Sequence, residues 1–185
     1  MGRKLHLAVG LNRLDPNAYG GWDGKLNACV ADAKAMAALS EAHGFKTAIL
    51  TDEKATRQGV LQSLAMLAKS VKSGDTVLFT TSQHGGLVPD KSGDEASGFD
   101  VVTCLYDGLM LDDEYFTALQ AFPKGVLVVA MADACQVETF TRDVLPGRPK
   151  AMPANVANLF AGAFQKRAKA RRETTACTIV EIAAT

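Results

Sequence analysis

The chain lacks a long apolar run, a net charge and any closely spaced pair of cysteines. No stretch approaches the roughly 20 apolar residues that a membrane-spanning helix needs, so we expect no membrane partner. Lysine plus arginine number 20, and aspartate plus glutamate also number 20. This balance argues against binding of nucleic acid through the overall charge of the protein. With 48% apolar and 22% charged residues among 185, the chain is not wholly disordered and fits one domain, or one domain plus a fragment.

The four cysteines are widely separated, at Cys29, Cys104, Cys135 and Cys177. Such spacing favours neither a disulfide scaffold nor a zinc ribbon. At the N-terminus, two basic residues precede a short apolar run that lacks the long apolar region and cleavage site of a signal peptide. We therefore expect reduced thiols and a cytoplasmic location.

The charged residues gather in two places. Eight acidic residues and one lysine lie between Asp90 and Glu114, and five basic residues lie between Lys166 and Arg172. The acidic segment is either a solvated loop or a cation site. The basic segment is either a solvated helix end, a protease-sensitive stretch or a short nucleic-acid-binding run. One short basic run in a neutral chain gives little support to the last of these, and we expect no nucleic-acid partner.

Short apolar runs alternate with segments of helical periodicity. Strands are predicted at 5–11, 45–50, 76–81, 126–132 and 178–183, and helices at 26–40, 60–71, 112–122 and 156–170. A polar loop is predicted over 82–100, followed by a short strand or hairpin at 103–110. This alternation indicates an α/β domain with a mainly parallel sheet. Ligands of such sheets bind beyond the carboxyl ends of the strands, which singles out 82–86 and 133–136.

His84 and Cys135 each follow one of these apolar strands and are 51 residues apart along the chain. If the two strands are neighbours, the imidazole and the thiol face each other across the sheet edge. Histidine can lower the pKa of a thiol and later protonate a leaving group, so the pair could carry out covalent catalysis. The backbone amides of Gly85 and Cys135 could stabilise an oxyanion. Taken singly, a cysteine after a strand is more often a core residue, and a histidine beside glycines is more often structural.

Five short motifs follow one another along the chain: Tyr19-Gly20-Gly21-Trp22-Asp23-Gly24, Cys29-Val30-Ala31-Asp32, Ser82-Gln83-His84-Gly85-Gly86, Leu111-Asp112-Asp113-Glu114 and Asp133-Ala134-Cys135. In order and spacing, this set resembles the caspase–metacaspase family of cysteine peptidases (family C14, clan CD), closest to bacterial type I metacaspases. The resemblance implies a caspase-like three-layer sandwich, with a central, mainly parallel sheet flanked by helices. It also implies that Cys135 is the nucleophile of an endopeptidase and that His84 is its base and acid.

The same resemblance implies further site residues. Asp32, Ser82 and Asp133 match an acidic pocket that receives arginine or lysine at P1, the residue before the cleaved bond. Asp100, Asp112, Asp113 and, more loosely, Asp143 match a calcium site. Calcium would be an activator, since the chemistry itself requires no cofactor; a helix-capping role for Asp112 and Asp113 is the alternative. The expected partner is a peptide or protein substrate.

The resemblance also divides the chain. Residues 1–150 match the large (p20-type) catalytic portion, 151–175 form a basic linker or helix, and 176–185 match the start of a truncated small (p10-type) portion. A small-subunit portion or a fused regulatory domain is therefore a further expected partner. A zymogen of this specificity could cut itself within the linker, where the candidates are Lys166, Arg167, Lys169, Arg171 and Arg172.

Two departures from the family pattern favour alternatives. Gln83 stands where the family has glycine, and Gln136 and Glu138 replace a histidine and a glycine after the nucleophile. These changes motivate a catalytically inactive caspase-like scaffold or regulatory module as the main rival function. A nucleotide-binding α/β protein has less support, because no glycine-rich phosphate loop follows the first strand.

Overall fold

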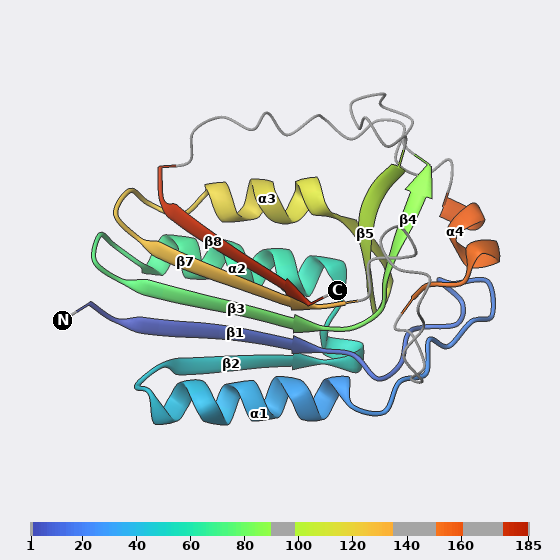
Figure 1. Ribbon diagram of the computed structural model, residues 1–185, viewed down its shortest axis with the longest axis horizontal. Helices are drawn as coiled ribbons and strands as arrows, with labels where there is room; N and C mark the ends of the chain where they lie inside the picture. Colours follow the sequence, from blue (N-terminus) through green and yellow to red (C-terminus); the bar gives the residue numbers. More distant parts are fainter. Residues whose placement is uncertain (1, 90–98, 135–150, 161–175, 185) are drawn as a thin grey trace.

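A five-stranded parallel sheet forms the centre of the molecule. The computed structural model describes residues 2–89, 99–134, 151–160 and 176–184 (Figure 1). The strand order is β2-β1-β3-β7-β8, and every neighbouring pair is parallel. The strands are β1 (Lys4–Gly10), β2 (Lys46–Thr51), β3 (Thr76–Ser82), β7 (Leu127–Asp133) and β8 (Thr178–Ala184). All five lie where the sequence predicts strands, within two residues at either end, so the expected α/β class is confirmed.

Helices cover both faces of this sheet (Figure 1). The first, α1 (Cys29–Ala42), packs on β1, β2 and β3, whereas α2 (Arg57–Ser70) and α3 (Asp112–Gln120) pack together on the opposite face. This arrangement follows from the right-handed crossovers that parallel strands require. Two shorter helices, η1 (Asp52–Lys54) and α4 (Ala154–Phe160), complete the described part, where no helix has the length and apolarity needed to cross a bilayer.

A second, antiparallel sheet of three strands stands beside the carboxyl ends of β3 and β7 (Figure 1). Its strands are β4 (Gly85–Pro89), β5 (Phe99–Leu105) and β6 (Gly108–Leu111), in the order β4-β5-β6. The predicted hairpin at 103–110 is confirmed as the β5–β6 turn. The prediction of a polar loop throughout 82–100 was wrong at Ser82, which ends β3, at 85–89, which form β4, and at 99–100, which begin β5. Two glycines and a proline in five residues hide the strand signal of β4.

Helix starts differ from the predicted ones for identifiable reasons. Thr56 caps α2, because its Oγ1 accepts a hydrogen bond from the Gly59 amide at 3.0 Å, so the helix predicted at 60–71 begins at Arg57. The predicted capping role of Asp112 and Asp113 is wrong in position. Leu111 is the N-cap of α3, and both aspartates lie in its first turn. The helix predicted at 26–40 begins at Cys29.

Candidate active site

The carboxyl ends of β3 and β7 lie side by side at the edge of the sheet. The two strands are hydrogen-bonded neighbours with Ser82 paired to Asp133, which confirms the adjacency on which the Cys–His prediction depended. His84 comes two residues after Ser82, and Cys135 comes two residues after Asp133. Cys135 itself lies outside the described residues, so its contact with His84 stays a prediction.

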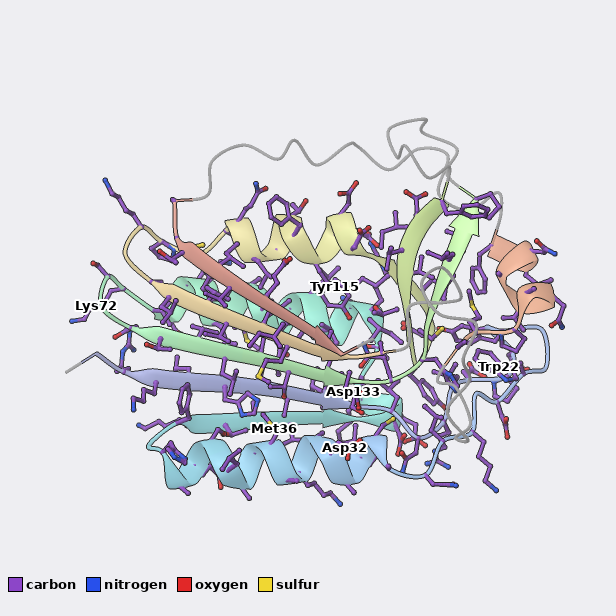
Figure 2. The ribbon with its side chains drawn as sticks, in the orientation of Figure 1. Trp22, Asp32, Met36, Lys72, Tyr115 and Asp133 are labelled. Carbon is purple, nitrogen blue, oxygen red and sulfur yellow. The ribbon has the colours of Figure 1, made fainter. Side chains whose placement is uncertain are left out.

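His84 is held in one orientation by contacts on several sides. It is buried, and its Nε2 lies 3.0 Å from the carbonyl oxygen of Gly24. The Trp22 ring lies against it with 4.8 Å between ring centroids (Trp22 is labelled in Figure 2). Since a carbonyl only accepts, this hydrogen bond assigns the proton to Nε2. Nδ1 is then the nitrogen with the lone pair, and therefore the one that can take a proton from a thiol.

The backbone conformation at position 24 and the close approach of Leu14 require glycine there. Its φ is +56°, and a Cβ there would lie 2.5 Å from Leu14 Cδ1 and 3.4 Å from His84 Cδ2. Trp22 and Gly24 belong to the motif at 19–24, but the sequence predicts no role for either residue. Nothing local in the sequence indicates that a carbonyl 60 residues before His84 orients the imidazole ring.

Asp32 and Asp133 lie close to each other at the same edge (Figure 2), and Ser82 is paired with Asp133. The Ser82 Oγ lies 3.0 Å from Asp32 Oδ2 and 3.3 Å from Asp133 Oδ2. These three residues line a cavity of about 310 Å³ between α1 and the sheet, named here the acidic cavity. The one proton of the Ser82 hydroxyl serves one carboxylate at a time, so the two carboxylates keep acceptor capacity that can bind a guanidinium or ammonium group through charge-assisted hydrogen bonds.

The start of α1 places Asp32 at the cavity. Gly10, the last residue of β1, lets the helix approach closely, because a Cβ there would lie 2.2 Å from the carbonyl oxygen of Cys29. The N-cap Ala28 offers no capping side chain. Asn12 takes over this role, since its Oδ1 accepts a hydrogen bond from the Val30 amide at 3.2 Å. Asp32 therefore lies in the first helical turn, where the helix dipole favours a carboxylate.

Gly85 and Gln83 flank the candidate base. Gly85 begins β4 and is buried, and its carbonyl accepts a hydrogen bond from the Met152 amide at 2.8 Å. Its role as an oxyanion donor stays a prediction. Gln83 is completely buried, and neither atom of its side-chain amide has a hydrogen-bond partner in the described part of the chain. Its backbone amide donates to the Asp133 carbonyl at 3.4 Å.

The other three cysteines are structural in character. Cys29, Cys104 and Cys177 are buried, and none is joined to another in a disulfide within the described residues. Burial raises the pKa of the Cys104 and Cys177 thiols above the ordinary range, and the Cys177 thiol donates to the Leu119 carbonyl at 3.4 Å. A thiol with a raised pKa is a poor nucleophile at neutral pH. Cys29 is completely buried within α1, so Cys135 remains the candidate nucleophile by its position after β7.

The expected calcium ligands are not assembled by the residues that the structure describes. Asp100 lies in β5, Asp112 and Asp113 lie in the first turn of α3, and Asp143 is outside the described residues. Across the described ranges, no three His, Cys, Asp or Glu side chains come together as a metal site. Calcium activation stays a prediction, and no catalytic step is derived from it. The autoprocessing candidates between 166 and 172 also lie outside the described residues.

The fold and the edge residues together define an α/β protein with a polar candidate site at the carboxyl ends of its parallel strands. Comparison with known proteins gives the family. Residues 6–143 match the family model described as metacaspase, peptidase C14 domain. The chain is 33% identical over 153 residues to metacaspase-1 of Sclerotinia sclerotiorum, covering 75% of this chain and 34% of that protein. It is 31% identical to metacaspase-1 of Scheffersomyces stipitis, covering 75% of this chain and 36% of that protein.

The fold is also similar to a solved structure. The crystal structure of protein GSU0716 from Geobacter sulfurreducens superposes with a TM-score of 0.85 at 36% identity, covering 98% of this chain and 72% of the other. The chain therefore belongs to the metacaspase family of C14 peptidases, as the resemblance implied. It spans about a third of the length of the curated metacaspases that it matches.

Proposed function

We propose that this chain is the catalytic portion of a cysteine endopeptidase that cleaves peptide bonds after arginine or lysine. The observation that carries the proposal is the Ser82 hydroxyl, 3.0 Å from one carboxylate and 3.3 Å from another at the strand ends that lead to His84 and Cys135. A P1 guanidinium would bind Asp32 and Asp133 in a planar, charge-assisted arrangement. A P1 carboxylate would be repelled there.

The chemistry begins with transfer of the Cys135 thiol proton to His84 Nδ1. The thiolate attacks the scissile carbonyl carbon, and the carbonyl oxygen gains a negative charge that the amides of Gly85 and Cys135 would stabilise. The C–N bond then breaks, and the leaving amine takes the proton from His84. A water molecule, deprotonated by His84, hydrolyses the thioester, and the proton returns to the thiolate.

The role of His84 in this scheme depends on its orientation. Because Nε2 donates to the Gly24 carbonyl, the protonated ring keeps that hydrogen bond while Nδ1 carries the transferred proton. The Trp22 ring and the burial of His84 limit other ring positions. The base is therefore prepared for proton transfer at one named atom, and little reorganisation is needed during the reaction.

The test is hydrolysis of fluorogenic peptides that differ only at P1, with arginine, lysine, glutamine or aspartate. We expect cleavage after arginine and lysine, none after aspartate, and loss of all cleavage in Cys135→Ala. Parallel reactions with Ca²⁺ and with a chelator determine whether the predicted calcium activation exists. Cleavage after aspartate would contradict the proposal that the acidic cavity binds the P1 side chain. Labelling of Cys135 by an arginine-based thiol probe without peptide turnover would favour the inactive scaffold.

A further inference from the structure

The acidic cavity continues past its carboxylates into an apolar space. Its walls form two tiers that follow from strand register. Ser82 and Asp133 are paired at the strand ends, and Thr80, Met131 and Ile182 are paired with one another two residues earlier. Two residues of a strand span roughly 7 Å. The outer tier, at the sheet edge, is therefore polar. The inner tier lies deeper, towards the amino ends of the strands.

On the side of the cavity formed by α1, a polar residue is likewise followed by an apolar residue at greater depth. Asp32 belongs to the outer tier, and Met36, one helical turn later, lies about 6 Å further along α1 and lines the inner tier. Figure 2 shows Met36 set back from Asp32 and Asp133, away from the strand ends. The Thr80 hydroxyl is already engaged in a hydrogen bond with His6 Nε2, at 2.9 Å. The inner tier is therefore lined mainly by two methionines and an isoleucine.

We infer that the cavity accepts arginine carrying methyl groups on one terminal guanidinium nitrogen, and that it binds this side chain better than plain arginine. This inference rests on the proposed function. A P1 side chain enters from the edge that carries His84, so its cationic group meets the outer tier first. Only what lies beyond the guanidinium can reach Met36, Met131 and Ile182.

The chemistry of methylation matches the two tiers. Methylation keeps the positive charge of arginine and removes one N–H donor for each methyl group. Asymmetric dimethylarginine carries both methyl groups on one nitrogen, so the other nitrogens can still donate to Asp32 and Asp133. Symmetric dimethylarginine has one methyl on each terminal nitrogen, so only one of its methyl groups can face the inner tier while the other takes the place of an N–H donor beside the carboxylates. Methionine side chains adapt readily to small apolar groups.

The test compares four fluorogenic peptides with arginine, monomethylarginine, asymmetric dimethylarginine or symmetric dimethylarginine at P1. We expect kcat/KM to rise roughly fourfold for each methyl group buried on the same nitrogen. The symmetric isomer should be cleaved less efficiently than the asymmetric one, although mass and charge are identical. The variant Met36→Gln should bring the ratio of asymmetric dimethylarginine to arginine cleavage towards one.

Met66→Gln is the matched control, because Met66 is 65% exposed on α2 and lies outside the cavity; it should leave the ratio unchanged. If Met36→Gln does not fold, Met131→Gln tests the same tier, and the four peptides test the inference on the unaltered protein. Cleavage of the arginine peptide without a gain for the asymmetric isomer overturns this inference alone. Failure to cleave any of the four peptides overturns the proposed function as well.

Discussion

At the scale of single residues, Gln83 is the departure from the family pattern whose structural consequence is now visible. It stands beside the candidate base His84, where the family pattern has glycine. Its side chain is completely buried, and its amide lacks a partner in the described part of the chain. A buried amide left without hydrogen bonds costs about 1–3 kcal/mol.

Replacing Gln83 by methionine should therefore stabilise the protein. Methionine has nearly the same length and no polar group to desolvate, so we expect the free energy of unfolding to rise by about 1–3 kcal/mol. Urea unfolding measures the change. The control is Gln62→Met at an exposed position of α2, where no gain is expected. A loss of stability in Gln83→Met, with Gln62→Met unchanged, would mean that the amide has a partner in the folded protein.

His6 is a second residue with a measurable signature. It is buried in β1, with Nδ1 2.7 Å from Ser40 Oγ and Nε2 2.9 Å from Thr80 Oγ1. Burial lowers the pKa of His6 to about 4, from 6.5. The folded protein therefore excludes a proton that the unfolded chain accepts. The stability contributed by neutral His6 is complete above pH 6.5 and is lost as the pH falls towards 4.

Between these two pH values the loss should amount to about 3 kcal/mol in the free energy of unfolding. Unfolding by urea at several pH values measures it, and His6→Gln should flatten this part of the profile. His43 offers a matched control, since it is exposed at the end of α1, and His43→Gln should leave the profile as it was. An unaltered slope in His6→Gln would assign the acid sensitivity to other groups.

At the scale of elements, α1 shows how a site residue depends on a cap that the sequence does not reveal. Asp32 was predicted as a site residue, but Ala28 at the N-cap has no side-chain hydrogen bond. Asn12, in the loop after β1, supplies the acceptor for the Val30 amide. Helical periodicity found the body of α1, whereas its start is fixed by this tertiary contact, which no local pattern encodes.

Asn12→Ala should lower the free energy of unfolding by about 1 kcal/mol, the usual cost of a lost N-cap. It should also weaken cleavage after arginine, because the first turn of α1 carries Asp32. Thermal unfolding and peptide kinetics measure the two effects. Asn17→Ala is the control, since the Asn17 side chain donates a hydrogen bond to Asp15 in an exposed turn. Equal stability of the two variants would exclude Asn12 as the cap.

The elements also show where sequence reasoning succeeds and where it stops. The five parallel strands are predictable because each is a compact apolar run, and their alternation with helices fixes the class. β4 is not predictable, because Gly85, Gly86 and Pro89 oppose strand propensity and pairing with β5 supplies the stability instead. In the site, Asp32, Ser82 and Asp133 are found through motifs, whereas the Gly24 carbonyl depends on a contact between distant loops.

At the scale of the whole molecule, the two edges of the central sheet differ in composition and in role. The carboxyl edge carries His84 and the acidic cavity. The amino edge is closed by Asp75, a buried residue that accepts hydrogen bonds from the Arg3 amide at 2.7 Å and the Lys72 amide at 3.0 Å and pairs with the Arg3 guanidinium. These hydrogen bonds hold the pKa of Asp75 at about 2. Asp75 thereby ties the start of β1 to the turn before β3.

This division predicts opposite effects for the same chemical change at the two edges. Asp75→Asn should lower the thermal midpoint of unfolding without changing kcat/KM for a P1-arginine peptide, because the amide cannot replace a carboxylate that accepts from three groups. Asp133→Asn should leave the midpoint nearly unchanged, since Asp133 is exposed. Asp133→Asn should reduce kcat/KM for the arginine peptide on the order of ten- to a hundredfold, the usual value of a charged hydrogen bond.

The destabilisation by Asp75→Asn should disappear below about pH 2, where the native carboxylate is itself protonated. If instead Asp75→Asn impaired cleavage and Asp133→Asn impaired folding, the carboxyl edge would be part of the structural core, and the acidic cavity would lose its role in binding the P1 side chain.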